Sequence, residues 1–199
     1  MKTKNNSALI AGTVSSAPAA YLCCGERFWS FKLTVMRRSG TEDTLEVNCP
    51  QLVLPQVREG DEVCLDGQIR SYAKTVDGKS QLSVALFVLK AETYVGDINL
   101  VGLEGYLCEK TEFRTTPSGR DICYAMLAVN RDRGKADYIP QVFWGRTAKR
   151  VSEMQVGTQI RVEGRLQSRT YTKKNATRTV FEVSVGKVSE GGTNDAQGS

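Results

Sequence analysis

Hydrophobic and polar positions alternate most clearly between Ile160 and Tyr171. One face of an extended chain would carry Ile160, Val162, Leu166 and Ser168, and the opposite face Arg161, Arg165, Gln167, Arg169 and Tyr171. This period of two is typical of a strand with one buried face. Shorter apolar stretches recur at residues 8–14, 31–35, 101–107 and 125–129. The pattern predicts an all-β chain built from short strands.

The two halves of the chain resemble each other, with an offset that grows from 93 to 97 residues. Ala8–Val14 parallels Val101–Leu107, and Leu65–Ile69 parallels Val162–Leu166. Self-similarity of this kind indicates that one structural unit has been duplicated.

Each half is expected to hold five strands, with one short helix between the third and the fourth. The helical segments are predicted at Gln51–Val57 in the first copy and at Arg146–Met154 in the second. This order is typical of the oligonucleotide-binding (OB) barrel. We therefore predict an all-β fold of two tandem five-stranded OB-fold barrels.

The repeat also predicts the domain boundaries. An N-terminal barrel is expected at residues 1–93, a linker at 94–98 and a C-terminal barrel at 99–189. The remaining residues, 190–199, are polar and rich in glycine, so we expect a disordered tail.

Positive charge is concentrated in the second copy. The whole chain has a net charge of +5, with 27 basic and 22 acidic residues. Residues 1–93 hold 11 basic against 10 acidic residues, whereas residues 99–188 hold 16 against 9. An electropositive barrel is suited to a polyanion such as nucleic acid.

Several classes of function are disfavoured by what the sequence lacks. The chain contains no histidine, and its six cysteines show no C-x-x-C spacing, so we expect reduced thiols and no metal. We find no carboxylate cluster and no phosphate-binding glycine-rich loop, and we expect neither enzyme activity nor a cofactor. Without an apolar run of about 18 residues or a secretory signal, we predict no membrane association and a cytoplasmic location.

An OB barrel binds single strands on one sheet face, where aromatic side chains stack on bases and cations follow the phosphates. The fourth strand of the second copy offers a cationic row that ends in Tyr171, and neighbouring strands offer Tyr124, Tyr138 and Trp144. Arg114 and Arg120 flank a turn beside this face. The predicted DNA-binding residues are Arg114, Arg120, Tyr124, Arg131, Tyr138, Trp144, Arg146, Arg165, Gln167, Arg169, Tyr171, Lys173, Lys174 and Arg178. Each has a structural alternative, and a tryptophan in a strand is often core.

The first copy lacks most of these features. Its fourth-strand row reads Cys64, Asp66, Gln68, Arg70 and Tyr72, and the alignment sets Cys49 against Trp144. Trp29 aligns with Cys123 on the core side, so we interpret it as a packing residue. Weak DNA binding and a structural or dimerising role are both open for this barrel.

The second copy resembles the bacterial single-stranded DNA-binding protein family. The resemblance is carried by Asn99–Gly105, Phe143–Arg146 and Val162–Arg169, and it covers roughly residues 99–188. It implies that Tyr138, Trp144 and Tyr171 stack on bases, and that a two-barrel chain forms a homodimer, because the family assembles four barrels per particle. Family members end in an acidic tail with a hydrophobic tip, so the ending Ala196–Ser199 puts recruitment of repair enzymes in doubt.

The resemblance implies a non-catalytic protein that protects single-stranded DNA in replication, recombination or repair, in the bacterial cytoplasm or nucleoid. The main alternative is an RNA-binding or primosomal adaptor whose barrels chiefly hold other proteins.

Overall fold

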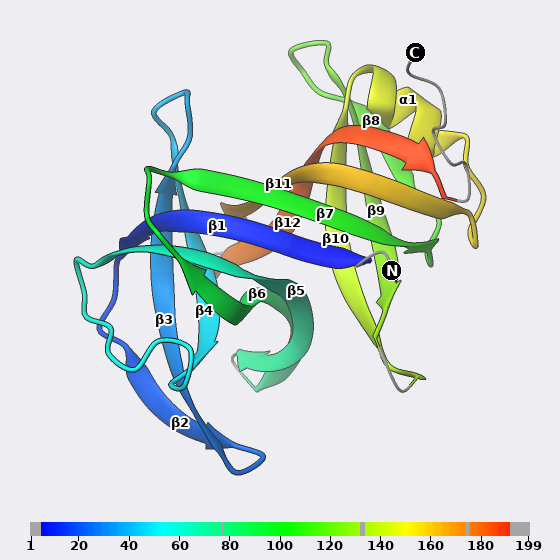
Figure 1. Cartoon of the computed structure of the whole chain (residues 1–199). Helices are drawn as coiled ribbons and strands as arrows, with labels where there is room; N and C mark the ends of the chain where they lie inside the picture. The colour runs from blue at the N-terminus through cyan, green and yellow to red at the C-terminus, as the bar shows by residue number, and fades with distance from the viewer. Residues whose placement is uncertain (1–4, 77, 132–133, 174–175, 192–199) are drawn as a thin grey trace, which may run out of the picture.

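The computed structural model describes residues 5–76, 78–131, 134–173 and 176–191, which form twelve strands and one helix (Figure 1). The first half supplies β1 (Asn6–Val14), β2 (Ala19–Cys23), β3 (Glu26–Met36), β4 (Glu42–Pro50), β5 (Glu62–Val76) and β6 (Lys79–Glu92). The second half supplies β7 (Ile98–Leu107), β8 (Glu112–Thr115), β9 (Asp121–Asn130), β10 (Ala136–Trp144), α1 (Arg146–Ser152), β11 (Gln159–Lys173) and β12 (Ala176–Glu190). Within these described ranges, no helix is long and apolar enough to cross a membrane.

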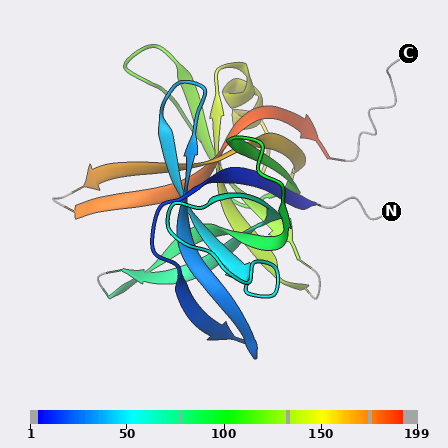
Figure 2. The same ribbon diagram turned by 60° about the vertical axis from the view of Figure 1, so that its left-hand side comes forward.

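Each half closes into a five-stranded barrel. β1 pairs with both β3 and β5, and β4 and β6 complete the circuit. β7, β9, β10, β12 and β11 form the same circuit in the second half. β2 and β8 are short additions on the outer edges of β3 and β9. The β5–β6 and β11–β12 strand pairs extend to the same side of the molecule (Figure 2). The predicted tandem OB barrels are confirmed.

The predicted helix in the first barrel is wrong. Residues 51–53 form a turn and residues 54–57 are irregular; the N–H groups of Val53 and Leu54 both donate to the carbonyl of Pro50, at 3.0 and 3.2 Å. Pro55 has no N–H to extend this turn, and its ring disfavours a helical conformation at Leu54. In the second barrel the helix forms, but it ends at Ser152 instead of Met154.

The period-two pattern correctly predicts which side chains of β11 form the core. Ile160, Val162 and Leu166 are fully buried in the hydrophobic cluster. Ser168 has the same parity but is only half-buried, and it contacts the other barrel instead of the core. The six cysteines are all free thiols, as the sequence predicts.

Two glycines repeat between the copies because the backbone passes close to a neighbouring strand. A Cβ on Gly67 or on Gly164 would lie 2.2 Å from the carbonyl oxygen of Phe87 or of Ser184, respectively. No side chain fits at such a distance, which explains why both halves keep a glycine here.

The two barrels are joined edge to edge by an antiparallel pairing of β1 with β7. The register runs from Asn6 opposite Leu103 to Ala11 opposite Ile98. Strand β7 therefore begins at Ile98, inside the predicted linker, and β12 extends to Glu190, inside the predicted tail. Residues 192–199 of that tail lie outside the described residues. The result is one continuous sheet of twelve strands.

Beside this pairing, a serine of each barrel forms a hydrogen bond with an aspartate of the other barrel. The N–H of Ser71 in β5 donates to Asp137 Oδ1 in β10 at 2.6 Å, and Ser71 Oγ accepts the N–H of Tyr138 at 2.9 Å. On the other side, Ser168 N–H donates to Asp43 Oδ1 and Ser168 Oγ accepts the N–H of Thr44, both at 3.1 Å. We call these two arrangements the serine–aspartate crossings.

Arginines neutralise both aspartates. Asp137 is fully buried and is bonded by Arg131 and by Arg70, whose Nη1 lies 3.0 Å from Oδ2. Asp43 is bonded by Arg37 at 2.5 and 2.6 Å. Burial by itself would raise the pKa of Asp137, but Arg131, the Ser71 N–H and Arg70 together hold the pKa below its usual value.

We predict that Asp137→Asn lowers the free energy of unfolding at pH 7 by roughly 3 kcal/mol, because two partly buried guanidiniums lose their counter-charge. A carboxyl with a lowered folded-state pKa stabilises the fold above its unfolded pKa, near 3.8, and this contribution is lost as pH falls through the folded value. The variant should therefore lose less stability than the parent below about pH 4. Urea unfolding at pH 7, 5, 4 and 3 measures this, with the exposed Glu109→Gln as control. Parallel pH profiles for parent and Asp137→Asn would contradict it.

Candidate nucleic-acid interface

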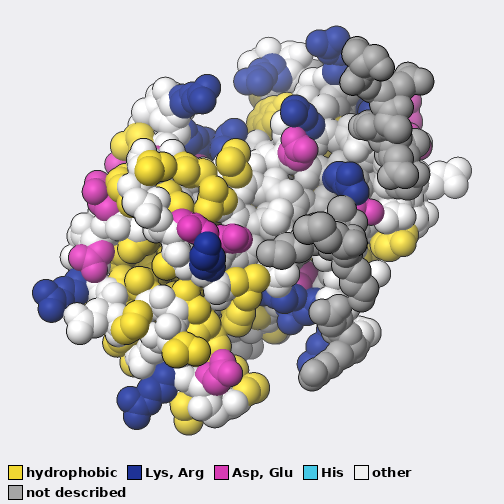
Figure 3. Space-filling model, in the orientation of Figure 1, with side chains coloured by type: hydrophobic (Ala, Val, Ile, Leu, Met, Phe, Trp, Pro, Cys, Tyr) yellow, Lys and Arg dark blue, Asp and Glu magenta, His cyan; other side chains and the backbone are white. Residues whose placement is uncertain are grey.

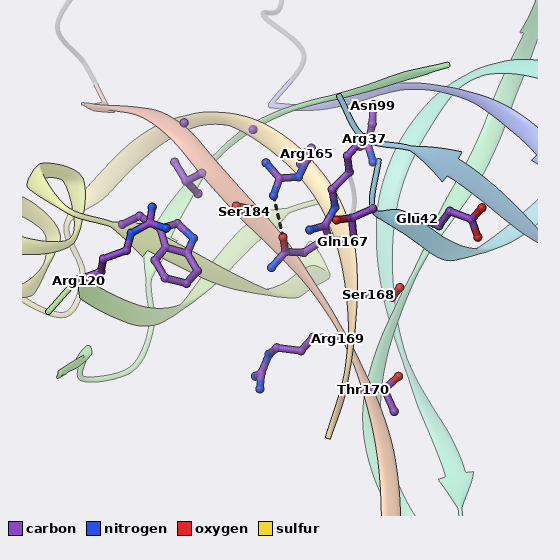
Figure 4. Close-up of a pocket in the computed structure, with 15 residues that line it drawn as sticks. Arg37, Glu42, Asn99, Arg120, Arg165, Gln167, Ser168, Arg169, Thr170 and Ser184 are labelled. Carbon is purple, nitrogen blue, oxygen red and sulfur yellow. Dashed lines mark hydrogen bonds between the residues drawn. The ribbon is translucent and has the colours of Figure 1, made fainter. Parts of the chain in front are cut away.

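A cavity of about 770 Å³ lies on the outer side of β11, where the second barrel faces the β3–β4 turn of the first. Four arginines line it, namely Arg37, Arg120, Arg165 and Arg169, and the only acidic residue among the lining residues is Glu42. Figure 4 shows the four arginine side chains placed around this space, with Arg120 on one side and Arg37 on the other. We call this cavity the arginine groove. Its charge suits an anionic chain.

Arginines also cover the aromatic rings at this face. The Arg120 guanidinium lies 5.2 Å from the centre of the Trp144 ring, and that of Arg169 lies 5.3 Å from Tyr171 and 5.8 Å from Tyr124. Arg114 stacks on Tyr124 at 5.0 Å. Trp144, Tyr124 and Tyr171 are half-buried, so part of each remains accessible. The structure thus brings together cations and stacking surfaces that come from four strands and a loop.

Two polar residues of β11, Gln167 and Arg169, form hydrogen bonds to Glu182 of the neighbouring strand β12. Gln167 is only 7% exposed, and its amide donates to Glu182 Oε1 at 2.9 Å. Arg169 reaches the same carboxylate oxygen at 3.4 Å. Arg161, from the predicted cationic row, pairs with Glu104 at 2.7 Å and is not among the residues that line the groove. The buried acid Glu182 on β12 was not anticipated from the sequence.

Arg165 is in an unusual electrostatic position. Burial and the nearby positive charge of Arg37 lower the pKa of its guanidinium, and Asp43 opposes this effect. Its Nη2 donates to Gln167 Oε1 at 3.2 Å, whereas its Nε is buried and has no hydrogen-bond partner within the described part of the chain.

Of the other predicted residues, Arg131, Tyr138 and Arg146 do not line the groove. Arg131 is bonded to Asp137 and to the carbonyl of Ser71, and it lines a cavity of the first barrel. Tyr138 is 47% exposed on β10, beside the Ser71 crossing. Arg146 is the exposed first residue of α1. Lys173 ends β11 and Arg178 is the register partner of Tyr171 in the β11–β12 pair, but their side chains, like the whole of Lys174, lie outside the described part of the structure.

Sequence reasoning missed Arg37, a first-barrel residue that lines the groove of the second barrel. A signal for it exists in the repeat, because Arg37 and Asp43 have the same spacing as Arg131 and Asp137. Each of the two arginines lines a cavity of the other barrel, and this depends on the contact between the barrels, which the spacing does not show.

Comparison with known proteins identifies the family. Residues 98–190 match the model of the single-strand binding protein family. Over 112 residues the chain is 36% identical to "Single-stranded DNA-binding protein" of Clostridium tetani (strain Massachusetts / E88), a match that covers 51% of this chain and 77% of that protein. The chain belongs to the single-strand binding protein family.

Other members of the single-strand binding protein family match in the same way. "Single-stranded DNA-binding protein 1" of Staphylococcus aureus (strain COL) is 39% identical over 95 residues, which cover 44% of this chain and 56% of that relative. The chain therefore spans little more than half of the length of this relative. Wild-type single-stranded DNA binding protein from Thermus aquaticus has a similar fold, with a TM-score of 0.76 at 20% identity, covering 98% of this chain and 96% of that one. This likeness extends the fold to the first barrel.

The first barrel of this family member presents a different face. Glu46 accepts hydrogen bonds from the Tyr72 hydroxyl and, at 2.6 Å, from Lys74 Nζ. Burial, and then the Glu46 hydrogen bond, raise the pKa of Tyr72 to about 12. Tyr21 is bonded to Asn48 at 2.9 Å and stacks on Phe28. An acid thus occupies the face that corresponds to the arginine groove.

The alignment of Cys49 with Trp144 is wrong by one position. Cys49 lies opposite Trp29 in the β3–β4 pair, as Phe143 lies opposite Cys123 in the β9–β10 pair, so Trp144 corresponds to Pro50. Trp29 packs against the core, and its indole N–H donates to the carbonyl of Leu54 at 3.0 Å. The packing role predicted for Trp29 is confirmed.

The two tryptophans of this single-strand binding family member should respond differently to substitution. Trp144→Ala should weaken oligo-dT binding by roughly 1–3 kcal/mol, because a stacking surface is lost, with little effect on unfolding. Trp29→Ala should cost about 3 kcal/mol of stability and leave the affinity nearly unchanged. Oligo-dT titration and urea unfolding of both variants test this. A Trp144→Ala variant that unfolds easily but binds normally would show that the ring serves the fold.

Proposed function

We propose that the protein binds single-stranded DNA on the second barrel without catalysing a reaction. The observation that carries this proposal is the arginine groove beside Trp144, Tyr124 and Tyr171. Aromatic rings provide stacking surfaces for bases of any sequence, and guanidiniums neutralise phosphates. The relatives are named single-stranded DNA-binding proteins, which supports this assignment. Protection of single strands in bacterial replication, recombination or repair, in the cytoplasm or nucleoid, is the role that we propose.

Within this proposal the predicted residues have different tasks. Trp144, Tyr124, Tyr171 and the more distant Tyr138 stack on bases. The phosphate contacts come from Arg114, Arg120, Arg146, Arg165, Arg169, Lys173, Lys174 and Arg178. Gln167 positions its neighbours through Glu182, and Arg131 holds the contact between the barrels. We further propose that residues 1–93 and 99–189 are the two domains, with the first domain mainly structural.

We predict that the full chain binds oligo-dT with an affinity that falls as salt rises. The slope of log affinity against log salt should be about −0.7 for each phosphate contacted, because bound counterions are released. Fluorescence anisotropy with labelled oligo-dT between 50 mM and 500 mM NaCl measures the slope. A salt-independent affinity would contradict the proposal, and equal affinity for oligo-rU would favour the RNA-binding alternative.

We also propose that the chain forms a homodimer of four barrels through the outer face of β1 and β7. This face has a cavity of about 760 Å³ that includes Leu9 and Leu100, and Leu100 is 60% exposed. The ion pairs Lys90–Glu92 and Lys187–Glu163 lie at this cavity. Figure 3, which views the molecule from this side, shows hydrophobic side chains gathered mainly over the first barrel, with acidic and basic side chains among them. An apolar centre with mixed charges around it can pair with a second copy of itself.

Light scattering should therefore give a mass of two chains, each of 21.9 kDa. Leu100→Glu should give a monomer at micromolar concentration, because it places a charge in the apolar centre, whereas Leu52→Glu, at an exposed site away from β1 and β7, should leave the dimer intact. A monomer mass for the parent chain would overturn this proposal.

A further inference from the structure

Arg37 belongs to the first barrel but lines the arginine groove of the second. It follows β3, and two hydrogen bonds, of 2.6 Å from Nε and 2.5 Å from Nη2, fix its guanidinium on Asp43. Asp43 in turn accepts the Ser168 N–H of β11. Both barrels therefore hold Arg37 in place, and its position depends on the contact between them.

Arg165 approaches Arg37 from the second barrel. Both side chains line the arginine groove, where Figure 4 shows them next to each other, and the charge of Arg37 contributes to lowering the pKa of Arg165. Holding like charges together in a partly buried place is unfavourable. The buried Nε of Arg165, which has no hydrogen-bond partner among the described residues, adds a further cost. An anion with several acceptor oxygens between the two side chains would relieve the repulsion, because it carries negative charge and accepts hydrogen bonds from both guanidiniums.

We propose that Arg37 and Arg165 form a single phosphodiester site, the inter-barrel clamp, to which each barrel contributes one arginine. The clamp rests on the function proposed above and specifies where the bound strand crosses from one barrel to the other. Its ligand is one backbone phosphate, recognised by charge and geometry and not by base. The first barrel thus contributes a cation to DNA binding, although Glu46 occupies its own corresponding face.

The duplication supplies a counterpart that lacks the clamp. At the other crossing, Gln68 corresponds to Arg165, and Arg131 corresponds to Arg37. There Arg70 and Arg131 both donate to Asp137, so that aspartate takes up both charges. At the clamp, Arg37 donates to Asp43, while the side-chain bond of Arg165 goes to the neutral Gln167.

The first test is Arg165→Gln in the full chain, with glutamine chosen because the first barrel carries it at the matching strand position. The affinity for oligo-dT at 50 mM NaCl should fall roughly tenfold, and the salt slope should become shallower by about 0.7, the value for one lost phosphate contact. Arg38→Gln removes an equal charge from a neighbouring exposed position that does not line the groove. That control should change the affinity less than about twofold, as is usual for an exposed surface charge.

The second test removes the other half of the clamp. The double variant Arg37→Gln/Asp43→Asn avoids a buried unpaired carboxylate, and it should lower the affinity and the slope as Arg165→Gln does. Combining all three substitutions should cost clearly less than the product of the separate losses, because both arginines hold the same phosphate. Arg131→Gln/Asp137→Asn disturbs the other crossing and should lower stability without changing the salt slope.

These outcomes separate the clamp from the function on which it rests. If the parent binds oligo-dT and Arg165→Gln matches Arg38→Gln in affinity and slope, the clamp is wrong and DNA binding stands. Losses that multiply independently would show two separate contacts and would also overturn it. If the parent binds no single strand, the proposed function itself fails. Urea midpoints for every variant confirm that the folded protein is compared, and the Arg37 double variant decides alone if Arg165→Gln does not fold.

Discussion

The pairing of β1 with β7 determines what the rest of the molecule can do. Six residue pairs join the two barrels into one sheet, because the part of β1 that does not pair with β3 pairs with the part of β7 that does not pair with β9. Because a hydrogen-bonded pair fixes both distance and direction, the pairing also decides which outer faces meet. It brings Ser168 to Asp43 and Ser71 to Asp137, and so places the β3–β4 turn of the first barrel against the arginine groove of the second.

Within this shared frame the two copies have kept their backbone and changed their chemistry. Gly67 and Gly164 remain because each lies against a carbonyl, a requirement of the barrel and not of any ligand. Positions on the outer face are free of that requirement and have diverged, as the pair Gln68 and Arg165 shows. In the first barrel Glu46 forms an ion pair with Lys74. In the second barrel the guanidiniums of Arg120 and Arg169 lie over the rings of Trp144 and Tyr171. The second barrel thus supplies three of the four arginines of the groove, and the first barrel supplies Arg37.

How far the sequence predicts this protein depends on whether a feature is local. Burial of Ile160, Val162 and Leu166 follows from a period of two, and the repeat shows two barrels. The prediction of a first-barrel helix was wrong because Pro55 interrupts the apolar stretch. Gln167 has the parity of an exposed residue but is buried by Glu182, which comes from the neighbouring strand. Arg37 could not be assigned to the groove, since its role depends on a contact between segments more than 120 residues apart.

The serine–aspartate crossings are best understood as devices that fix register. A buried carboxylate paired with arginine adds little net stability, because desolvation offsets much of the attraction. The β1–β7 pair alone specifies its register weakly, since a slip of two residues would keep every side chain on its own face. Such a slip would separate Ser168 from Asp43 and Ser71 from Asp137 at once, leaving two buried charges without their N–H donors. Other registers of the β1–β7 pair are therefore destabilised by unpaired buried carboxylates. The observed register is also the one that places Arg37 beside Arg165.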